Sequence, residues 1–300
     1  MSDLLDAAHA AAKLARAHGA DEAAIYVSRS RGVEVEWRDG RLERVQEETR
    51  RSLSAELYVN GRYSASSTND LRPAALEAFL REAVEMTRLL EPDLYRGLPD
   101  PARYPKDVTL DLDLCDPGFE AVTGEARRAQ AELLEQQVRA LADDLSIISV
   151  TSGVGDSHGQ SARVHTNGFE GEREGTTFSM SVMVTVKDAD GRRPMGWDYT
   201  YRRHRGELLP TDKLARTAVD RARSQLGAGR LATGKYTLVV DPKAVPRLLG
   251  ALFSPLSGPA LQQRRSLFED RLNTPIASKL LTIIDEPHRK RGLGASLWDG

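Results

Sequence analysis

The feature that most constrains this 300-residue sequence is a pattern that occurs twice: a helix, alternating strands joined by tight turns, and a second helix. Four dipeptides typical of hairpin connections mark the turns, namely Asp39-Gly40, Asn60-Gly61, Asn167-Gly168 and Asp190-Gly191. Hairpins join antiparallel strands, whereas parallel strands need long crossovers. The pattern therefore predicts an α+β fold built on antiparallel sheet.

The first copy begins with a helix predicted over about 3–18, where apolar residues recur at helical spacing. Alternating strands follow in "AAIYVS", "VEVEW" and "SLSAELYV". A second helix has an apolar stripe formed by Leu76, Phe79, Leu80, Ala83 and Val84. The Pro- and Gly-rich stretch Glu91–Asp107 predicts a surface linker.

The second copy has a helix over about 118–142, strands in "SIISVTS", "SARVHT", "FEGERE", "TFSMSVMVTVK" and "PMGWDYTYR", and a helix over about 211–226. The last of these strands places four large side chains on one face: Met195, Trp197, Tyr199 and Tyr201. A third unit starts with a strand in "KYTLVVDP" and continues with a helix and a strand in "KLLTII". Its helix has an apolar stripe expected to be buried, formed by Val245, Leu248, Leu249, Leu252 and Phe253.

These patterns predict three domains: an N-terminal α+β unit with linker (1–106), a second α+β unit (107–230) and the incomplete start of a β-rich C-terminal domain (231–300).

Composition excludes several classes of protein. The net charge is −2, with 42 basic and 44 acidic residues, which gives no electrostatic basis for a nucleic-acid or membrane partner. The single cysteine, Cys115, excludes an intramolecular disulfide. The N-terminus lacks the features of a signal peptide, and no apolar run approaches the ~20 residues of a membrane helix. We therefore expect a cytoplasmic protein.

Asp156, Ser157 and His158 provide the residue types of a hydrolytic triad, but sequence neighbours rarely supply triad geometry. The glycines around them favour a turn. His158 and His165 could be metal ligands joined by a hairpin, although no third ligand lies nearby in sequence.

Acidic residues form a second candidate in Asp111, Asp113 and Asp116, whose spacing lacks the donors of a calcium loop. The leucines between them favour a strand with a solvated acidic face. Cys115 lies among these carboxylates, which predicts a raised thiol pKa.

The remaining charged clusters are most simply solvated. The basic residues Arg202, Arg203, His204 and Arg205, and also Arg289, Lys290 and Arg291, predict exposed loops rather than phosphate contacts. Glu34, Glu36, Glu43, Glu47 and Glu48 predict the wet face of a sheet. No phosphate-binding glycine loop is present. We therefore assign no catalytic, cofactor-binding or metal-binding residue.

The order of several stretches resembles the TldD/PmbA family, traditionally labelled modulators of DNA gyrase. They include "GADEAAIYVSRSRGVEVEWRDGRLERVQEE", "LYVNGRYSASSTNDL", "HTNGFEGEREGTTFSMSVMV", "TGKYTLVVDPKAV", "LSGPAL" and "GLGASLWDG". Together they run from about residue 19 to residue 300.

The resemblance implies a two-subunit peptidase, in which a TldD-like subunit carries an H-E-x-x-x-H helix that binds the catalytic metal. The other, TldE/PmbA-like subunit lacks this helix and completes the peptide chamber. The matching positions here, Gly250–Pro255, read "GALFSP" and offer no side chain that coordinates metal. Family members also continue well beyond "SLWDG".

We therefore expect a non-catalytic TldE/PmbA-like subunit of a heteromeric metallopeptidase, with zinc only on its TldD-like partner and unfolded peptides or peptide precursors as substrate. The alternative is a stand-alone binding or scaffold protein. A third hypothesis, direct DNA or gyrase binding, follows only from the family's old label, and the near-neutral charge argues against it.

Overall fold

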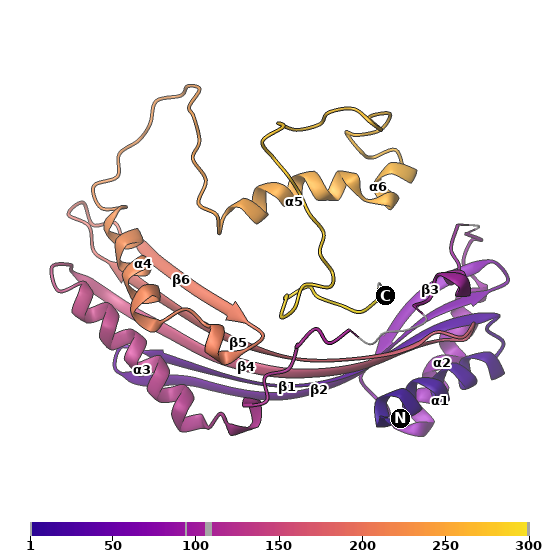
Figure 1. Cartoon of the computed structure of the whole chain (residues 1–300). Coiled ribbons are helices and arrows are strands. Elements are labelled where there is room, and N and C mark those ends of the chain that lie inside the picture. The colour runs from indigo at the N-terminus through magenta and orange to yellow at the C-terminus, as the bar shows by residue number, and fades with distance from the viewer. Residues whose placement is uncertain (1, 94, 106–109, 299–300) are drawn as a thin grey trace. The chain divides into compact units, whose positions relative to one another are not determined.

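The computed structural model describes residues 2–93, 95–105 and 110–298 (Figure 1). The chain divides into two compact units, one formed by residues up to Ala228 together with those from Glu286 onward, and the other by Gly229–Asp285.

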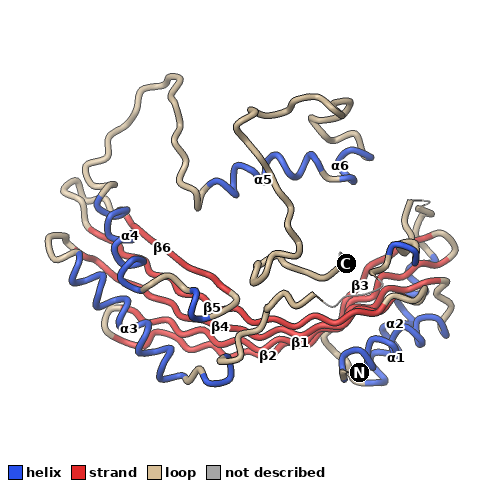
Figure 2. The backbone as a smooth tube through the Cα atoms, in the orientation of Figure 1, coloured by secondary structure: helices blue, strands red, loops and turns tan. Residues whose placement is uncertain are grey.

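A six-stranded antiparallel sheet forms the centre of the first unit, in the order β3-β2-β1-β4-β5-β6 (Figure 2). The strands are β1 (Glu22–Arg38), β2 (Arg41–Val59), β3 (Arg62–Thr68), β4 (Ile147–His165), β5 (Glu170–Val186) and β6 (Met195–Arg202). The α+β prediction is confirmed, and the two halves share one sheet through the long β1–β4 ladder. The domain boundaries at 106/107 and 230/231 stay a prediction.

Each half contributes two helices to the same face of the sheet. Helices α1 (Asp3–Ala17) and α2 (Pro73–Arg88) cover one end, and α3 (Gly124–Leu141) and α4 (Thr211–Arg223) cover the other (Figure 1). The burial of alternate strand residues explains this arrangement. Ile25, Val27 and Leu57 contribute to the core beneath α1 and α2, while Val154 and Val182 contribute to the core beneath α3 and α4.

The opposite face of the sheet, called the open face here, carries no α-helix from the described residues of this first unit. Its central residues are small and polar, and they include Ser28, Ser30, Gly155, Ser157, Gly159, Ser161, Ser179 and Ser181. At one end it carries the large side chains predicted to share a face, but these are exposed: Trp197 is 48% and Tyr199 is 42% accessible. The alternate residues Asp198 and Thr200 are buried instead.

The hairpin predictions are confirmed at all four turns. Asp39 and Gly40 have φ of 47° and 78°, and Asn60 and Gly61 have 49° and 71°, as a two-residue turn with positive φ at both central positions requires. At the third turn, the Gly168 N–H donates to the His165 carbonyl. At the fourth, between the antiparallel strands β5 and β6, Gly191 has a φ of 85° and its N–H donates to the Asp188 carbonyl.

Two predictions in the second half are wrong. The glycine-rich stretch around Asp156 is no turn, because β4 runs through it as one strand from Ile147 to His165 with continuous partners on both sides. Its glycines lie against neighbouring strands: a Cβ on Gly153 would meet the Ser181 hydroxyl at 2.9 Å. Residues 110–116 are irregular rather than a strand, since they follow the unpaired end of β5 with one backbone bond, from Thr176 N to Leu114 O.

The second unit contains the helices α5 (Val245–Leu256) and α6 (Gly258–Gln262) and no strand. The strands predicted in "YTLVVDP" and "KLLTII" are therefore wrong for this structure, because a strand needs a hydrogen-bonded neighbour and neither stretch has one. The predicted buried stripe of α5 is wrong too: none of its residues is buried, and Leu248 is 52% exposed. Among the described residues, none of the helices combines the length and the apolar character of a membrane-spanning segment.

Candidate binding site on the open face of the sheet

The largest of the described cavities, about 510 Å³, lies on the open face between the sheet and the segment 293–296. Its floor comes from β1 and β4, through Tyr26, Ser28, Ser30, Gly159 and Ser161. Apart from Tyr26 these residues have short side chains, so another chain could approach the strands closely. We call this cavity the groove.

Two arginines fix the segment that borders the groove. Arg203 donates through Nη2 to the Leu293 carbonyl at 2.8 Å. The Arg173 guanidinium lies 4.5 Å from the centroid of the Trp298 ring and also donates to the Trp298 carbonyl. Both arginines also line the groove, together with Arg29 and one carboxylate, Glu174, so its lining is net cationic.

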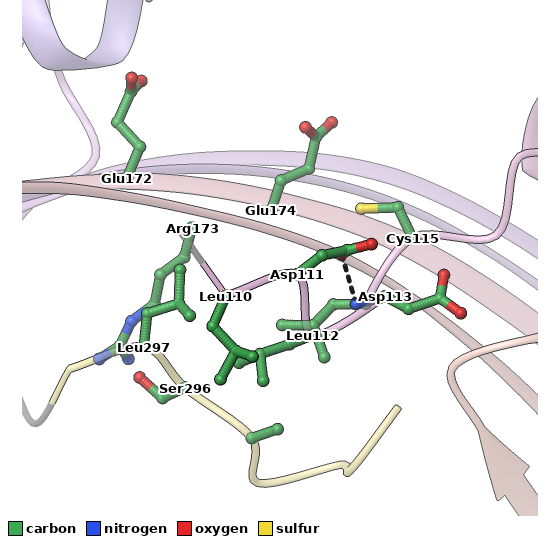
Figure 3. A pocket seen from close by; sticks show the side chains of 12 residues that line it. Leu110, Asp111, Leu112, Asp113, Cys115, Glu172, Arg173, Glu174, Ser296 and Leu297 are labelled. Atoms are coloured by element: carbon green, nitrogen blue, oxygen red, sulfur yellow. Dashed lines mark hydrogen bonds between the residues drawn. The ribbon is translucent and has the colours of Figure 1, made fainter. Parts of the chain in front are cut away.

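A second cavity of about 270 Å³ lies beside the groove, lined by residues 110–115, Glu172–Glu174 and 295–297. Figure 3 shows that Glu172 and Glu174 project from one side of β5 and Arg173 from the other, while the Cys115 side chain points toward Glu174. Burial, and to a lesser degree the Glu174 carboxylate, raises the pKa of the Cys115 thiol. The predicted direction is correct, although burial contributes more than the carboxylates.

Asp156, Ser157 and His158 do not form a triad. Asp156 lies on the helix face, where it accepts two hydrogen bonds from Arg127 of α3. Ser157 points to the open face and its hydroxyl pairs with that of Thr177 at 2.7 Å. Since successive strand residues face opposite sides of a sheet, Ser157 cannot transfer a proton to His158.

His158 and His165 do not converge either, because they lie seven residues apart on an extended strand. His165 is 5% exposed and contacts Tyr104 and Arg163. Arg163 can only donate, so His165 Nε2 accepts and the proton of the neutral ring lies on Nδ1. Burial, together with the Arg163 charge, lowers the pKa of His165 to about 4.

The acidic and basic clusters pair with each other. Arg291 bridges Asp113 at 2.6 Å and Glu207 at 2.8 Å. His204 donates through Nε2 to the backbone carbonyl of Asp113 at 2.9 Å, and the same nitrogen lies 3.3 Å from the Asp113 carboxylate. The Asp116 carboxylate accepts from the Arg205 backbone N–H. The prediction that these basic residues lie in solvated loops is therefore wrong for buried His204, and Arg291 joins the segment after Glu286 to the loop around Asp113.

The glutamates of the first hairpin fall on both faces. Glu34 and Glu36 lie on the open face with Arg44, at 3.6 and 3.3 Å, and Glu47 lies on the helix face with Arg31. Beyond the helices both faces of β2 are solvated there, so these glutamates form no carboxylate pair for acid–base chemistry.

The helix α5 does not fit the metal site that the resemblance implies for a catalytic subunit. Gly250–Pro255 consists of Gly, Ala, Leu, Phe, Ser and Pro, and none of these residues has an imidazole or a carboxylate side chain. This stretch of the helix therefore supplies no metal ligand and no general base for hydrolysis.

Sequence reasoning missed the groove and the proximity of His158 to Glu174. The second could have been found, because the Asn167-Gly168 turn sets the register that places His158 opposite Thr176, two residues from Glu174 on the same face. The position of Cys115 has no such local signal.

Family models match three stretches: residues 23–87 match PmbA/TldA metallopeptidase domain 1, residues 117–226 the central domain and residues 233–300 the C-terminal domain. Among curated proteins, the chain is 27% identical over 284 residues to the metalloprotease PmbA of Escherichia coli O157:H7, covering 93% of this chain and 61% of that protein. A PmbA homologue of Haemophilus influenzae is 23% identical and is covered to 64%. The chain thus spans about three fifths of the length of these relatives.

Two solved structures are also similar. A candidate modulator of DNA gyrase from Bacteroides thetaiotaomicron is 35% identical, with a TM-score of 0.88, covering 98% of this chain and 66% of that one. TldE from Thermococcus kodakarensis is 16% identical with a TM-score of 0.59, covering 72% of this chain and 47% of that one. The latter shows likeness of fold alone.

Proposed function

Since this chain belongs to the PmbA/TldD metallopeptidase family, we propose that it is a non-catalytic, TldE/PmbA-like subunit that binds unfolded peptide for a metal-bearing TldD-like partner. The observation that carries this proposal is the chemistry of α5, whose residues Gly250–Pro255 hold no metal ligand and no general base. The peptide bond would be cleaved on the partner.

The open face supports a role in holding an extended chain. The groove has a floor of mostly small side chains and a net cationic lining, and Trp197 and Tyr199 stack at a centroid distance of 5.7 Å on the same face. Aromatic surfaces bind varied side chains with little loss of conformational freedom. Such a surface suits peptides of differing sequence.

The unpaired length of β2 offers a second means of binding. Its ladder with β3 covers only Leu53–Val59, so among the described residues 41–52 have β1 on one side and no strand on the other. An extended peptide can add to such an edge through main-chain hydrogen bonds, which do not depend on the side chains of the peptide. The charged side chains of this edge keep copies of the chain from pairing there.

The test compares the purified chain, a TldD-like partner with the H-E-x-x-x-H helix, and the two together, on a fluorogenic unfolded peptide. We expect no hydrolysis by the chain alone, and hydrolysis by the pair that a chelator abolishes. Chelator-sensitive hydrolysis by the chain alone would refute the proposal. Absence of any complex with the partner would favour the alternative, a stand-alone binding or scaffold protein.

The groove is tested in the same assay by Ser161→Gln, which fills its floor. Ser54→Gln is the matched control, because it lies on the open face but lines neither cavity. We expect the first variant to raise the KM of the pair for peptide and the second to leave it unchanged. Equal KM values for both variants would place peptide binding elsewhere.

A further inference from the structure

Three potential metal ligands from separate segments meet on the helix face of the sheet. The Cys115 sulfur, a His158 ring nitrogen and a Glu174 carboxylate oxygen all lie within 4.8 Å of one another. We propose that these three side chains form a binding site for a zinc-type divalent cation. The site is independent of the proposed function, and its failure would leave that function untouched.

The strand register brings two of the ligands together. His158 of β4 lies opposite Thr176 of β5, and Glu174 lies two residues further along the same face. His158 Nε2 is 2.6 Å from Glu174 Oε1, so one proton joins them in this structure. A bound cation would replace that proton and accept one lone pair from His158 Nε2 and one from the Glu174 carboxylate.

Backbone contacts hold Cys115 in place beside this pair. Thr176 N donates to the carbonyl of Leu114 at 2.9 Å, and Thr176 Oγ1 accepts from the N–H of Asp116 at 2.8 Å. Both neighbours of Cys115 are thus bound to the residue that lies opposite His158. Thr176 is 2% exposed, so the two hydrogen bonds that hold the backbone on either side of Cys115 are shielded from solvent.

Surrounding groups orient the ligands as in known metal sites. The Phe119 ring lies 5.4 Å from that of His158, and Gln160 Nε2 donates to Glu174 Oε1 at 2.8 Å. Partners of this kind fix a ligand's orientation and strengthen binding. Since Cys115 and Glu174 also line the 270 Å³ cavity, a fourth position would be open to water or a ligand.

The donor set selects the class of metal. Thiolate, imidazole and carboxylate together suit zinc and its spectroscopic substitute cobalt, and do not suit calcium or magnesium, which prefer oxygen alone. Around a tetrahedral zinc the ligand atoms lie about 3.3–3.6 Å apart, so binding requires shifts of about 1 Å in side chains that are partly exposed. His158 is 26% and Glu174 is 50% accessible, which leaves room for such shifts.

The test adds cobalt and then zinc to the full chain after treatment with a chelator. We expect one cobalt per chain, with the near-ultraviolet charge-transfer band of a thiolate ligand, displaced by zinc. Cys115 is the only cysteine, so reaction with a thiol reagent reports this site alone. We expect zinc to slow that reaction about ten-fold or more, because a bound thiolate cannot attack.

Variants separate the site from adventitious binding. Cys115→Ser should abolish the charge-transfer band, and Glu174→Gln should weaken zinc binding about ten-fold or more. The matched control is His9→Gln, because His9 also pairs with a β5 glutamate, Glu170 at 3.0 Å, on an exposed part of the same face. Binding without the charge-transfer band, unchanged thiol reactivity, or equal effects of His9→Gln and Glu174→Gln would overturn the proposal. The cobalt spectrum of the wild-type chain tests thiolate ligation by Cys115 even if a variant fails to fold.

Discussion

Arg127 of α3 and Asp156 of β4 form a bidentate ion pair beneath the sheet, with Nε–Oδ2 and Nη2–Oδ1 distances of 2.5 and 2.8 Å. Their side chains are 9% and 2% exposed. The pair gives both oxygens of a carboxylate in the middle of β4 a hydrogen-bond donor, and it links β4 to α3. Hydrogen bonding to Asp156 raises the pKa of Arg127, so the guanidinium stays charged.

We predict that Asp156→Asn lowers the free energy of unfolding by about 3–5 kcal/mol, because it leaves the Arg127 charge buried without a counter-charge. Urea denaturation measures this value. The matched control is Glu48→Gln, which breaks the exposed pair with Arg50 at 2.7 Å. It should cost less than about 1 kcal/mol. Similar losses from both variants would show that burial of the Arg127 pair has no energetic consequence.

A second prediction concerns Gly196, where β6 meets α4. A Cβ there would lie 2.0 Å from the Ala218 carbonyl oxygen and 2.4 Å from the Ala222 nitrogen, and backbone cannot move away cheaply. We expect Gly196→Ala to cost about 3 kcal/mol or more, beyond ordinary overpacking. Gly206→Ala, where nothing lies within 4 Å of the added methyl, should change stability by less than about 0.5 kcal/mol. Thermal unfolding of the two variants provides the comparison.

The third prediction is a pH dependence from His165. Its pKa falls from 6.5 to about 4 on folding, so the unfolded chain binds a proton more tightly than the folded one. The stabilisation is complete above pH 6.5 and is lost as the pH falls toward 4, by up to about 3 kcal/mol.

Denaturation between pH 4 and 7.5 should therefore show a steeper decline for the wild type than for His165→Gln, because only the wild type has this titrating ring. His9→Gln is the control, since His9 lies exposed on α1. An identical pH profile for His165→Gln and the wild type would mean that burial of the ring does not disfavour its protonation.

The fourth prediction tests which face of β6 is buried: Asp198 and Thr200 are buried, whereas the aromatic side chains are exposed. Trp197→Ser should change stability by less than about 1 kcal/mol, because the ring already faces solvent. Asp198→Ala should cost about 3 kcal/mol or more, because it removes the buried partner of Arg221 at 3.2 Å. If the proposed function holds, only Trp197→Ser weakens peptide binding by the pair while leaving the fold intact. Unfolding by Trp197→Ser would show instead that the aromatic face is part of the core.

Local sequence patterns predicted much of the fold because they act over short distances. The two-residue turns at Asn60-Gly61 and Asn167-Gly168 require positive φ, which Asn and Gly adopt at low cost, so they identify hairpins from the sequence alone. The apolar stripes of α1 and α4 have helical spacing and are buried as expected. The repeat of helix, strands and helix is likewise confirmed, as two halves of one sheet.

Elsewhere the same local signals misled. The glycines from Gly153 to Gly159 favour a turn in isolation, but in the sheet they let neighbouring strands and hydroxyls come close. The alternation of aromatic and polar residues in β6 predicted two different faces but not which of them is buried. The face with Asp198 and Thr200 is buried because α4 packs over it.

By itself, the sequence determined the fold class, the hairpins, the apolar stripes and the lack of metal ligands in Gly250–Pro255, because each depends on residue type and spacing within one segment. Only the tertiary structure decided that Cys115 meets His158 and Glu174, that Asp156 is neutralised by Arg127, and that a groove lies on the open face. The physical reason is that each of these depends on the distance between segments far apart in the chain, which register and packing set and no local pattern encodes.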